Sequence, residues 1–137
     1  MFGLTTATRV FAAADPIDMR KGFNGLYGLV RDSLAEDPLS GHLFLFTNRQ
    51  QTRLKVLVFD GSGLWICSKR LEKGRFAWPV PQPGQSRVTL RPGELALLLN
   101  GIDLTQTKSR PWFRGLSAAS NSQEKTVLQL LSQVYCK

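Results

Sequence analysis

Closely spaced turn signals in the middle of the chain constrain its fold more than any other feature. Asp60-Gly61 is a strong hairpin turn, and Lys73-Gly74 is a second turn. Short stretches with strand-like composition separate these and other polar breaks, at residues 42–47, 53–59, 64–71, 75–78 and 87–90. Such spacing leaves room only for short strands that pair with their neighbours in sequence. The segment therefore predicts an antiparallel meander of about three to five strands.

Two apolar segments of helical character flank this meander. Residues 19–36 carry an apolar stripe at three- and four-residue steps, formed by Phe23, Leu26, Val30 and Leu34. Asp18 precedes this segment as a candidate helix cap. Glycines weaken the start of the segment, so the alternative is a helix that begins later. Residues 95–100 are rich in leucine, and Pro92 and Glu94 are typical of a first helical turn.

Together these elements predict an α+β fold. After a short strand at residues 8–13, we expect the small antiparallel sheet to pack against the two helices. A chain of 137 residues is long enough for one such domain, which we place at residues 1–114. Residues 115–137 form a C-terminal extension, which we expect to be helical from about residue 122 to residue 135.

The C-terminal extension carries an apolar stripe of its own. Four side chains recur at helical spacing and are predicted to bind a partner: Val127, Leu130, Leu131 and Val134. A helix of about 13 residues is marginal in isolation, so this stripe must be buried somewhere. Self-association, docking on another protein and packing against the domain itself would each bury it, and the sequence leaves these alternatives open.

Positive charge is concentrated in the middle of the chain. The net charge is +8, and residues 42–114 hold twelve basic and four acidic residues, whereas the flanking segments nearly balance. Clustered positive charge attracts polyanions, although a basic surface can also serve solubility alone. Nine cations are candidate nucleic-acid contacts: Arg20, Lys21, Arg49, Arg53, Lys55, Lys69, Arg70, Lys73 and Arg75.

The turn within residues 69–78 is the sharpest candidate in this set. We expect one solvent-facing positive patch that contacts phosphates, formed by Lys69, Arg70, Lys73 and Arg75. Phe76 and Trp78 follow at once, and an exposed aromatic face could stack a base. Because large aromatic side chains dominate protein cores, we favour core packing for both of them.

Metal, cofactor and membrane functions find little support. The spacing of Cys67 and Cys136 matches no metal or redox motif, and we interpret Cys67 as a buried, inert thiol. His42 is the only histidine, so neither a metal nor a cofactor is expected. No stretch approaches the roughly 20 apolar residues of a membrane helix, and no signal peptide is recognisable. We therefore expect a cytoplasmic protein without a membrane partner.

Enzymatic activity is also not expected. Asp60, Asp103 and Glu124 occur in the D-D-E order of a two-metal nuclease, but each has a simpler role in a turn or at a helix end. Ser62 lies between two glycines, without the spacing of a nucleophile elbow. The sequence thus predicts no catalytic residues.

Several blocks of the chain, taken in order, resemble a known family. They are Asp18 to Phe23 with Gly25-Leu26, then Phe59 to Leu64, Lys69 to Pro79, and Leu95 to Asp103. This combination resembles the small accessory protein encoded by the second open reading frame, of the TnpB type, in the insertion-sequence-sixty-six family of bacterial transposable elements. The resemblance covers roughly residues 9–114. The resemblance implies a role in transposition beside a separate DDE-type transposase. It implies no catalytic residue in this chain.

Two hypotheses for the function follow from these observations. The first is a non-catalytic accessory factor in transposition that binds DNA through the basic middle segment. The alternative is a protein-interaction subunit that docks on the transposase, or on a sister accessory protein, without contacting nucleic acid. Salt distinguishes the two, because phosphate binding weakens steeply with ionic strength and an apolar interface does not.

Overall fold

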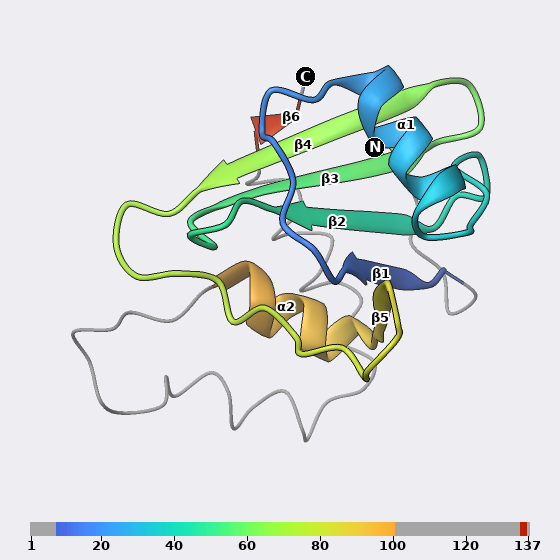
Figure 1. Cartoon of the computed structure of the whole chain (residues 1–137). Helices are drawn as coiled ribbons and strands as arrows, with labels where there is room; N and C mark the ends of the chain where they lie inside the picture. The colour runs from blue at the N-terminus through green and yellow to red at the C-terminus, as the bar shows by residue number, and fades with distance from the viewer. Residues whose placement is uncertain (1–7, 101–134, 137) are drawn as a thin grey trace.

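A mixed β-sheet with one helix on each face forms the framework of the protein (Figure 1). The computed structural model describes residues 8–100 and 135–136. The elements in chain order are β1 (Val10–Ala13), α1 (Phe23–Asp32), β2 (Leu43–Thr47), β3 (Arg53–Phe59), β4 (Leu64–Arg70), β5 (Arg87–Leu90), α2 (Pro92–Asn100) and β6 (Tyr135–Cys136). The strand order in the sheet is β5-β1-β2-β3-β4-β6. The predicted α+β class is confirmed.

Strands β2, β3 and β4 form the predicted antiparallel meander. Val56 of β3 lies between Leu45 of β2 and Cys67 of β4 in the register, and the Asp60–Gly63 turn joins β3 to β4. The sheet as a whole is not antiparallel, because β1 pairs with β2 in parallel. The reason is the crossover through α1, which returns the chain to the end of the sheet where β1 began. Strand β5 then pairs with β1 in the antiparallel sense.

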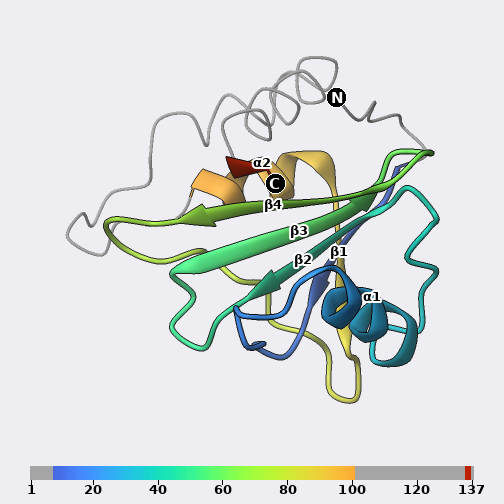
Figure 2. The same cartoon turned by 90° about the horizontal axis from the view of Figure 1, so that it is seen from above.

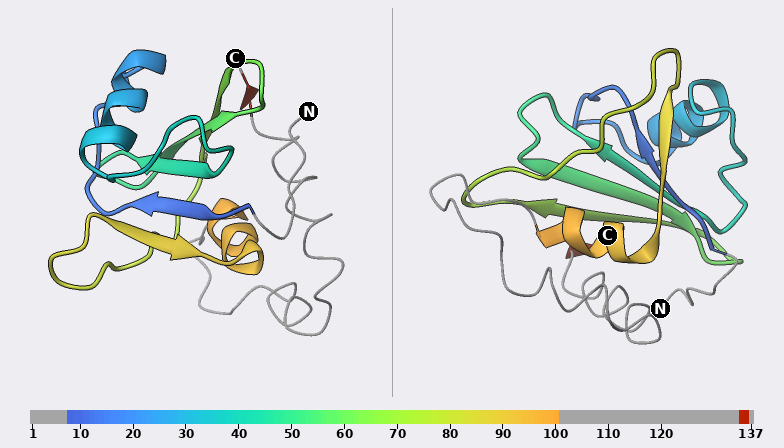
Figure 3. Two further views of the ribbon diagram at one scale, coloured as in Figure 1. Left: turned by 90° about the vertical axis from the view of Figure 1, so that its right-hand side faces the viewer. Right: turned by 90° about the horizontal axis from the view of Figure 1, so that it is seen from below.

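The two faces of the sheet are covered by different helices (Figures 2 and 3). On one face, Leu26 and Val30 of α1 pack with Leu57 of β3 and other buried side chains. On the opposite face, the buried leucines of α2 pack over Val56 and its neighbours. Successive residues of β3 alternate between these faces, so Arg53 and Lys55 lie on the same face as Leu57. This alternation decides which cations share a surface.

Helix α1 is shorter than the 19–36 segment predicted from the apolar stripe. It begins at Phe23, and Gly22 occupies the cap position without a side-chain hydrogen bond. Asp18 therefore does not cap the helix, and its carboxylate instead accepts a hydrogen bond from the backbone N–H of Arg20 at 2.9 Å. The helix ends at Asp32, and Ala35 then adopts a left-handed conformation with φ 55°. The alternative of a later start, suggested by the glycines, is the one that the structure supports.

Two expectations about short elements also need correction. Residues 75–78 form no strand beyond a single bridge at Arg75, because the chain enters a proline-rich stretch there. The predicted helix to residue 135 is wrong at its end, since Tyr135 belongs to β6, which pairs with β4. The rest of that predicted helix lies outside the described residues. Helix α2, by contrast, contains the predicted leucine-rich segment and has Glu94 in its first turn.

Cys67 differs from the inert thiol that its sequence context suggested. It is buried on β4 and is disulfide-bonded. Cys136 is the only other cysteine of the chain, and it is the register partner of Cys67 between β4 and β6. The spacing in sequence gave no sign of this pairing, because it depends on the position of β6 at the edge of the sheet.

Candidate nucleic-acid interface

Five of the predicted cations gather at one end of the sheet. Arg49 lies in the β2–β3 turn, Arg53 starts β3, Arg70 ends β4, and Lys73 and Arg75 lie in the loop after β4. This loop is joined to the β2–β3 turn by two backbone hydrogen bonds, from Leu71 to Thr52 and from Phe76 to Gln51. We call these five exposed side chains the basic end; Figure 1 shows the turn and the loop side by side.

A hollow of about 390 Å³ opens beside the basic end, and we call it the basic pocket. It is lined by Met19, Arg53, Leu54, Lys55, Ser68, Lys69, Arg70 and Glu72. Arg53 is the register partner of Arg70, and Lys55 is the register partner of Ser68. These four side chains therefore share the face of the sheet that carries α1. Met19 approaches from the segment that leads into α1, so two distant parts of the sequence meet here.

The two arginines that line the basic pocket differ in their ion pairing. Arg70 forms an ion pair with Glu72 at 3.1 Å, with both side chains largely exposed. Arg53 is exposed and makes no side-chain ion pair with the residues that the structure describes. Like charges placed directly opposite on neighbouring strands repel each other. The Arg53–Arg70 pair thus leaves positive charge that Glu72 offsets only in part.

The segment before α1 is held against the sheet by Lys55. Its Nζ donates a hydrogen bond to the carbonyl of Lys21 at 2.9 Å. In the same segment, Arg20 pairs with Asp18 at 2.7 Å and holds the pKa of that carboxyl down to about 2, chiefly through their side-chain hydrogen bonds. The Arg20 charge is therefore balanced locally, whereas Lys21 is exposed.

Lys69 departs from the solvent-facing patch expected for residues 69–75. Its Nζ donates a hydrogen bond to the carbonyl of Leu99 at 2.8 Å, at the C-terminal end of α2. Lys69 is half-buried on this side because it alternates with Ser68 and Arg70 along β4. Proximity to a turn suggested exposure, but the two-residue period of the strand decides the direction of this side chain.

The aromatic residues after the turn belong to the core, as their size favoured. Phe76 is 1% exposed and packs beneath α2. Trp78 is partly buried, and its indole N–H donates to the carbonyl of Ala13 at 2.8 Å. A base-stacking role for Phe76 is excluded by this burial, so the basic end offers charge rather than an aromatic platform.

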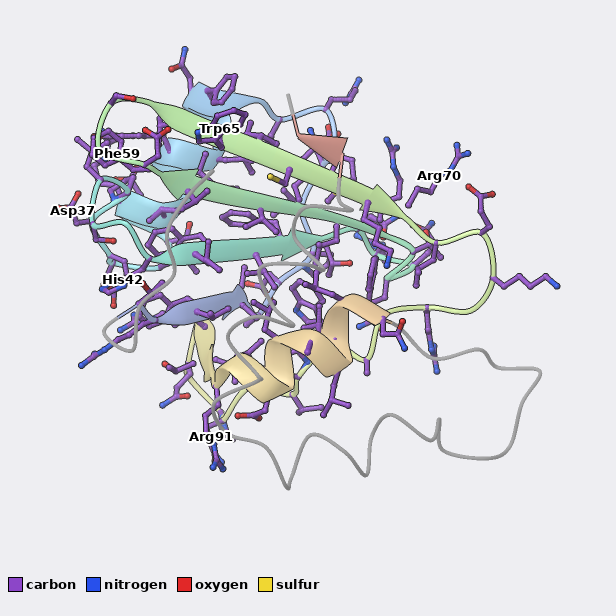
Figure 4. The ribbon with its side chains drawn as sticks, turned by 180° about the vertical axis from the view of Figure 1, so that it is seen from behind. Asp37, His42, Phe59, Trp65, Arg70 and Arg91 are labelled. Atoms are coloured by element: carbon purple, nitrogen blue, oxygen red, sulfur yellow. The ribbon has the colours of Figure 1, made fainter. Side chains whose placement is uncertain are left out.

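Cations elsewhere on the molecule have other surroundings. Arg87 is half-buried, pairs with Glu36 at 2.7 Å and lies over the Phe11 ring. Arg91 precedes α2 and is far from Arg70, as Figure 4 shows. Sequence reasoning missed Ser68 and Met19 as pocket residues. The register of β3 on β4 could have suggested Ser68, whereas the approach of Met19 required the path of the chain before α1.

The acidic residues and cysteines of the described part of the chain do not gather into a metal-ion site. This part of the chain has no cluster of three or more histidine, cysteine or acidic side chains suited to a metal ion. The Asp60 carboxylate accepts four hydrogen bonds, from the Ser62 N–H and hydroxyl, the Gly63 N–H and the Trp65 indole. Asp60 therefore organises the β3–β4 turn, as its position predicted. Asp103 and Glu124 lie outside the described residues.

The structure combines a small mixed sheet that has a helix on each face with a group of exposed cations at one end of that sheet. The chain belongs to the family described as IS66 Orf2 like protein, whose model matches residues 8–109. Membership in this family indicates an accessory role in transposition of insertion sequences.

Two relatives come from Sinorhizobium fredii strain NGR234. Uncharacterized protein y4jC is 37% identical over 111 residues, which cover 81% of this chain and 93% of the relative. Uncharacterized protein y4hO is 42% identical over 95 residues, which cover 69% of this chain and 81% of the relative. No solved structure matches the chain. Within the described residues, no helix has the length and apolar character needed to cross a membrane.

Proposed function

We propose that this accessory protein binds the nucleic-acid backbone through the basic end. The observation that carries the proposal is the convergence of five exposed cations from one turn, two strand ends and one loop. Their charges attract phosphates and release counterions when DNA binds. Such contacts position a protein on DNA without reading its sequence. We accordingly expect binding that depends weakly on sequence and strongly on salt.

The proposed ligand is the DNA of the element, and we expect the protein to bind it together with the transposase of the same element. The protein itself is proposed to carry out no hydrolysis or strand transfer. In support, the Asp60 carboxylate is already occupied by its own turn. Of the nine predicted contacts, Arg49, Arg53, Arg70, Lys73 and Arg75 stay in the proposal as the basic end. Arg20, Lys55 and Lys69 already have partners within the protein. Lys21 is exposed in the segment before α1.

The test is DNA binding by the full chain at increasing salt. Fluorescence anisotropy with labelled duplexes of unrelated sequence should give similar affinities that fall steeply between 50 and 200 mM salt, on the order of tenfold or more for several phosphate contacts. Absence of DNA binding, with a salt-tolerant complex between this protein and the transposase after nuclease treatment, would support the docking alternative instead. The apolar stripe predicted for that alternative, at residues 127–134, lies outside the described residues.

A further inference from the structure

One polar group in the basic pocket lacks a hydrogen-bond partner. The Ser68 hydroxyl is buried, and no residue in the described part of the chain donates to it or accepts from it. Leaving a buried hydroxyl unpaired costs on the order of 1–3 kcal/mol, and native structures contain few such groups. Ser68 lines the pocket on the same face as Arg53 and Arg70. Its hydroxyl is therefore a buried donor at the wall of the pocket whose hydrogen-bonding capacity is unused within the described residues.

The charges around Ser68 indicate that such a group is anionic. Arg53 and Arg70 stand directly opposite each other at the end of the β3–β4 ladder, and Lys55 pairs with Ser68 two residues further along it. Glu72 is the acidic side chain among the residues that line the pocket. An anion between the arginines would relieve their repulsion and accept the Ser68 hydrogen bond. This arrangement of donors and charges favours an anion as the ligand of the pocket.

A phosphate group fits these donors better than a carboxylate. Arginine side chains bind phosphate through two parallel N–H groups, and a phosphate offers enough oxygens for two guanidinium groups and a hydroxyl at once. A carboxylate has two oxygens with about four acceptor sites, which is fewer than the N–H and O–H groups of two bidentate guanidinium groups and a hydroxyl. The hollow of about 390 Å³ has room for a phosphate together with the sugar attached to it.

We propose that the basic pocket binds one phosphate group of a nucleic-acid backbone, held by the Ser68 hydroxyl and by Arg53 and Arg70. This inference rests on the proposed function and adds a particular site to it. The exposed cations of the basic end attract the polyanion, and the pocket fixes one of its phosphates. Ser68 is the residue that distinguishes a built site from a general positive field.

The experiment follows the backbone amides of the full chain by NMR during titration with inorganic phosphate and, separately, with a short oligonucleotide. Both probes should shift the amides of Arg53, Ser68 and Arg70. Ser68→Ala should weaken phosphate binding about tenfold, because a hydrogen bond to a charged group is lost. Ser68→Thr, which keeps the hydroxyl, should restore most of it. Arg53→Gln should weaken binding similarly, and Arg91→Gln, which changes an exposed arginine far from the pocket, should not.

The outcomes separate this inference from the proposed function. If the oligonucleotide binds but Ser68→Ala and Arg53→Gln behave like Arg91→Gln, the pocket inference is wrong and the proposed function stands. If inorganic phosphate shifts the pocket amides and the oligonucleotide does not bind, the pocket accepts free phosphate and the nucleic-acid role fails. If neither probe binds, both proposals fail. Arg53 is exposed, so its variant keeps the test valid even if a Ser68 variant folds poorly.

Discussion

Asp60 shows how a single side chain can organise a connection in this fold. Its carboxylate accepts the indole N–H of Trp65 at 2.6 Å and the backbone N–H groups of Ser62 and Gly63 at 2.9 Å. These hydrogen bonds favour the ionised form, so the pKa of Asp60 lies well below its usual range, with the Trp65 contact as the largest cause. Figure 4 shows Trp65 on β4 near this turn.

Asp60→Asn is expected to lower the melting temperature at neutral pH. A carboxyl whose pKa is lower in the folded state stabilises the protein fully above its unfolded pKa of about 3.9, and this contribution is lost as the pH falls below that value. The difference between wild type and Asp60→Asn should therefore be largest near pH 7 and shrink as the pH falls from about 4 toward 2. Thermal unfolding followed by circular dichroism checks this, with Asp15→Asn as a control for loss of one exposed acid. A pH-independent difference would contradict this account.

At the scale of secondary structure, the hairpin signals, the leucine-rich helix and the fold class could be predicted from the sequence. The Asp60-Gly61 turn and helix α2 each depend on residues that are close together in the sequence, so the local pattern is enough to predict them. The parallel pairing of β1 with β2 could not be predicted, because it depends on where α1 packs. The basic pocket was only partly predictable. Its cations can be recognised in the sequence, but only the register of β4 on β3 places Ser68 on the same face as Arg53 and Arg70.

We expect Lys69 to stabilise helix α2 and not to contact DNA. Its hydrogen bond to the Leu99 carbonyl satisfies an acceptor at the C-terminal end of α2, where a cation is also favoured by the helix dipole. Lys69→Met keeps much of the apolar stem and should lower the free energy of unfolding by about 1–2 kcal/mol. Chemical denaturation measures this change. The salt slope of DNA binding should stay the same, and a lower slope with unchanged stability would place Lys69 in the interface instead.

The disulfide bond of Cys67 is expected to hold β6 against β4. A disulfide that closes a long loop restricts the unfolded chain, which stabilises the folded state by about 4 kcal/mol for a loop of this size. Cys136→Ser should therefore lower the unfolding free energy of the oxidised protein. Under a thiol reductant, wild type and variant should unfold alike. A variant as stable as the oxidised wild type would show that the link contributes little.

At the scale of the whole molecule, charge is distributed unevenly in space as well as in sequence. The basic end collects cations from the β2–β3 turn and from the loop after β4, while Arg91 lies far from it (Figure 4). Arg31 and Arg91 each pair with a nearby acid, Asp32 and Glu94. Removing two cations from the basic end changes the net charge as much as removing Arg31 and Arg91. A difference in DNA binding between two such variants would therefore come from the position of the cations.

The most direct test of the account compares two double variants with the same change in net charge. Lys73→Ala/Arg75→Ala removes two cations from the basic end, and Arg31→Ala/Arg91→Ala removes two from elsewhere. The slope of log affinity against log salt for duplex DNA should fall by up to about two for the first variant and stay near the wild-type value for the second. Equal slopes for both variants, or a wild-type slope near zero, would contradict the claim that this accessory protein binds nucleic acid through its basic end.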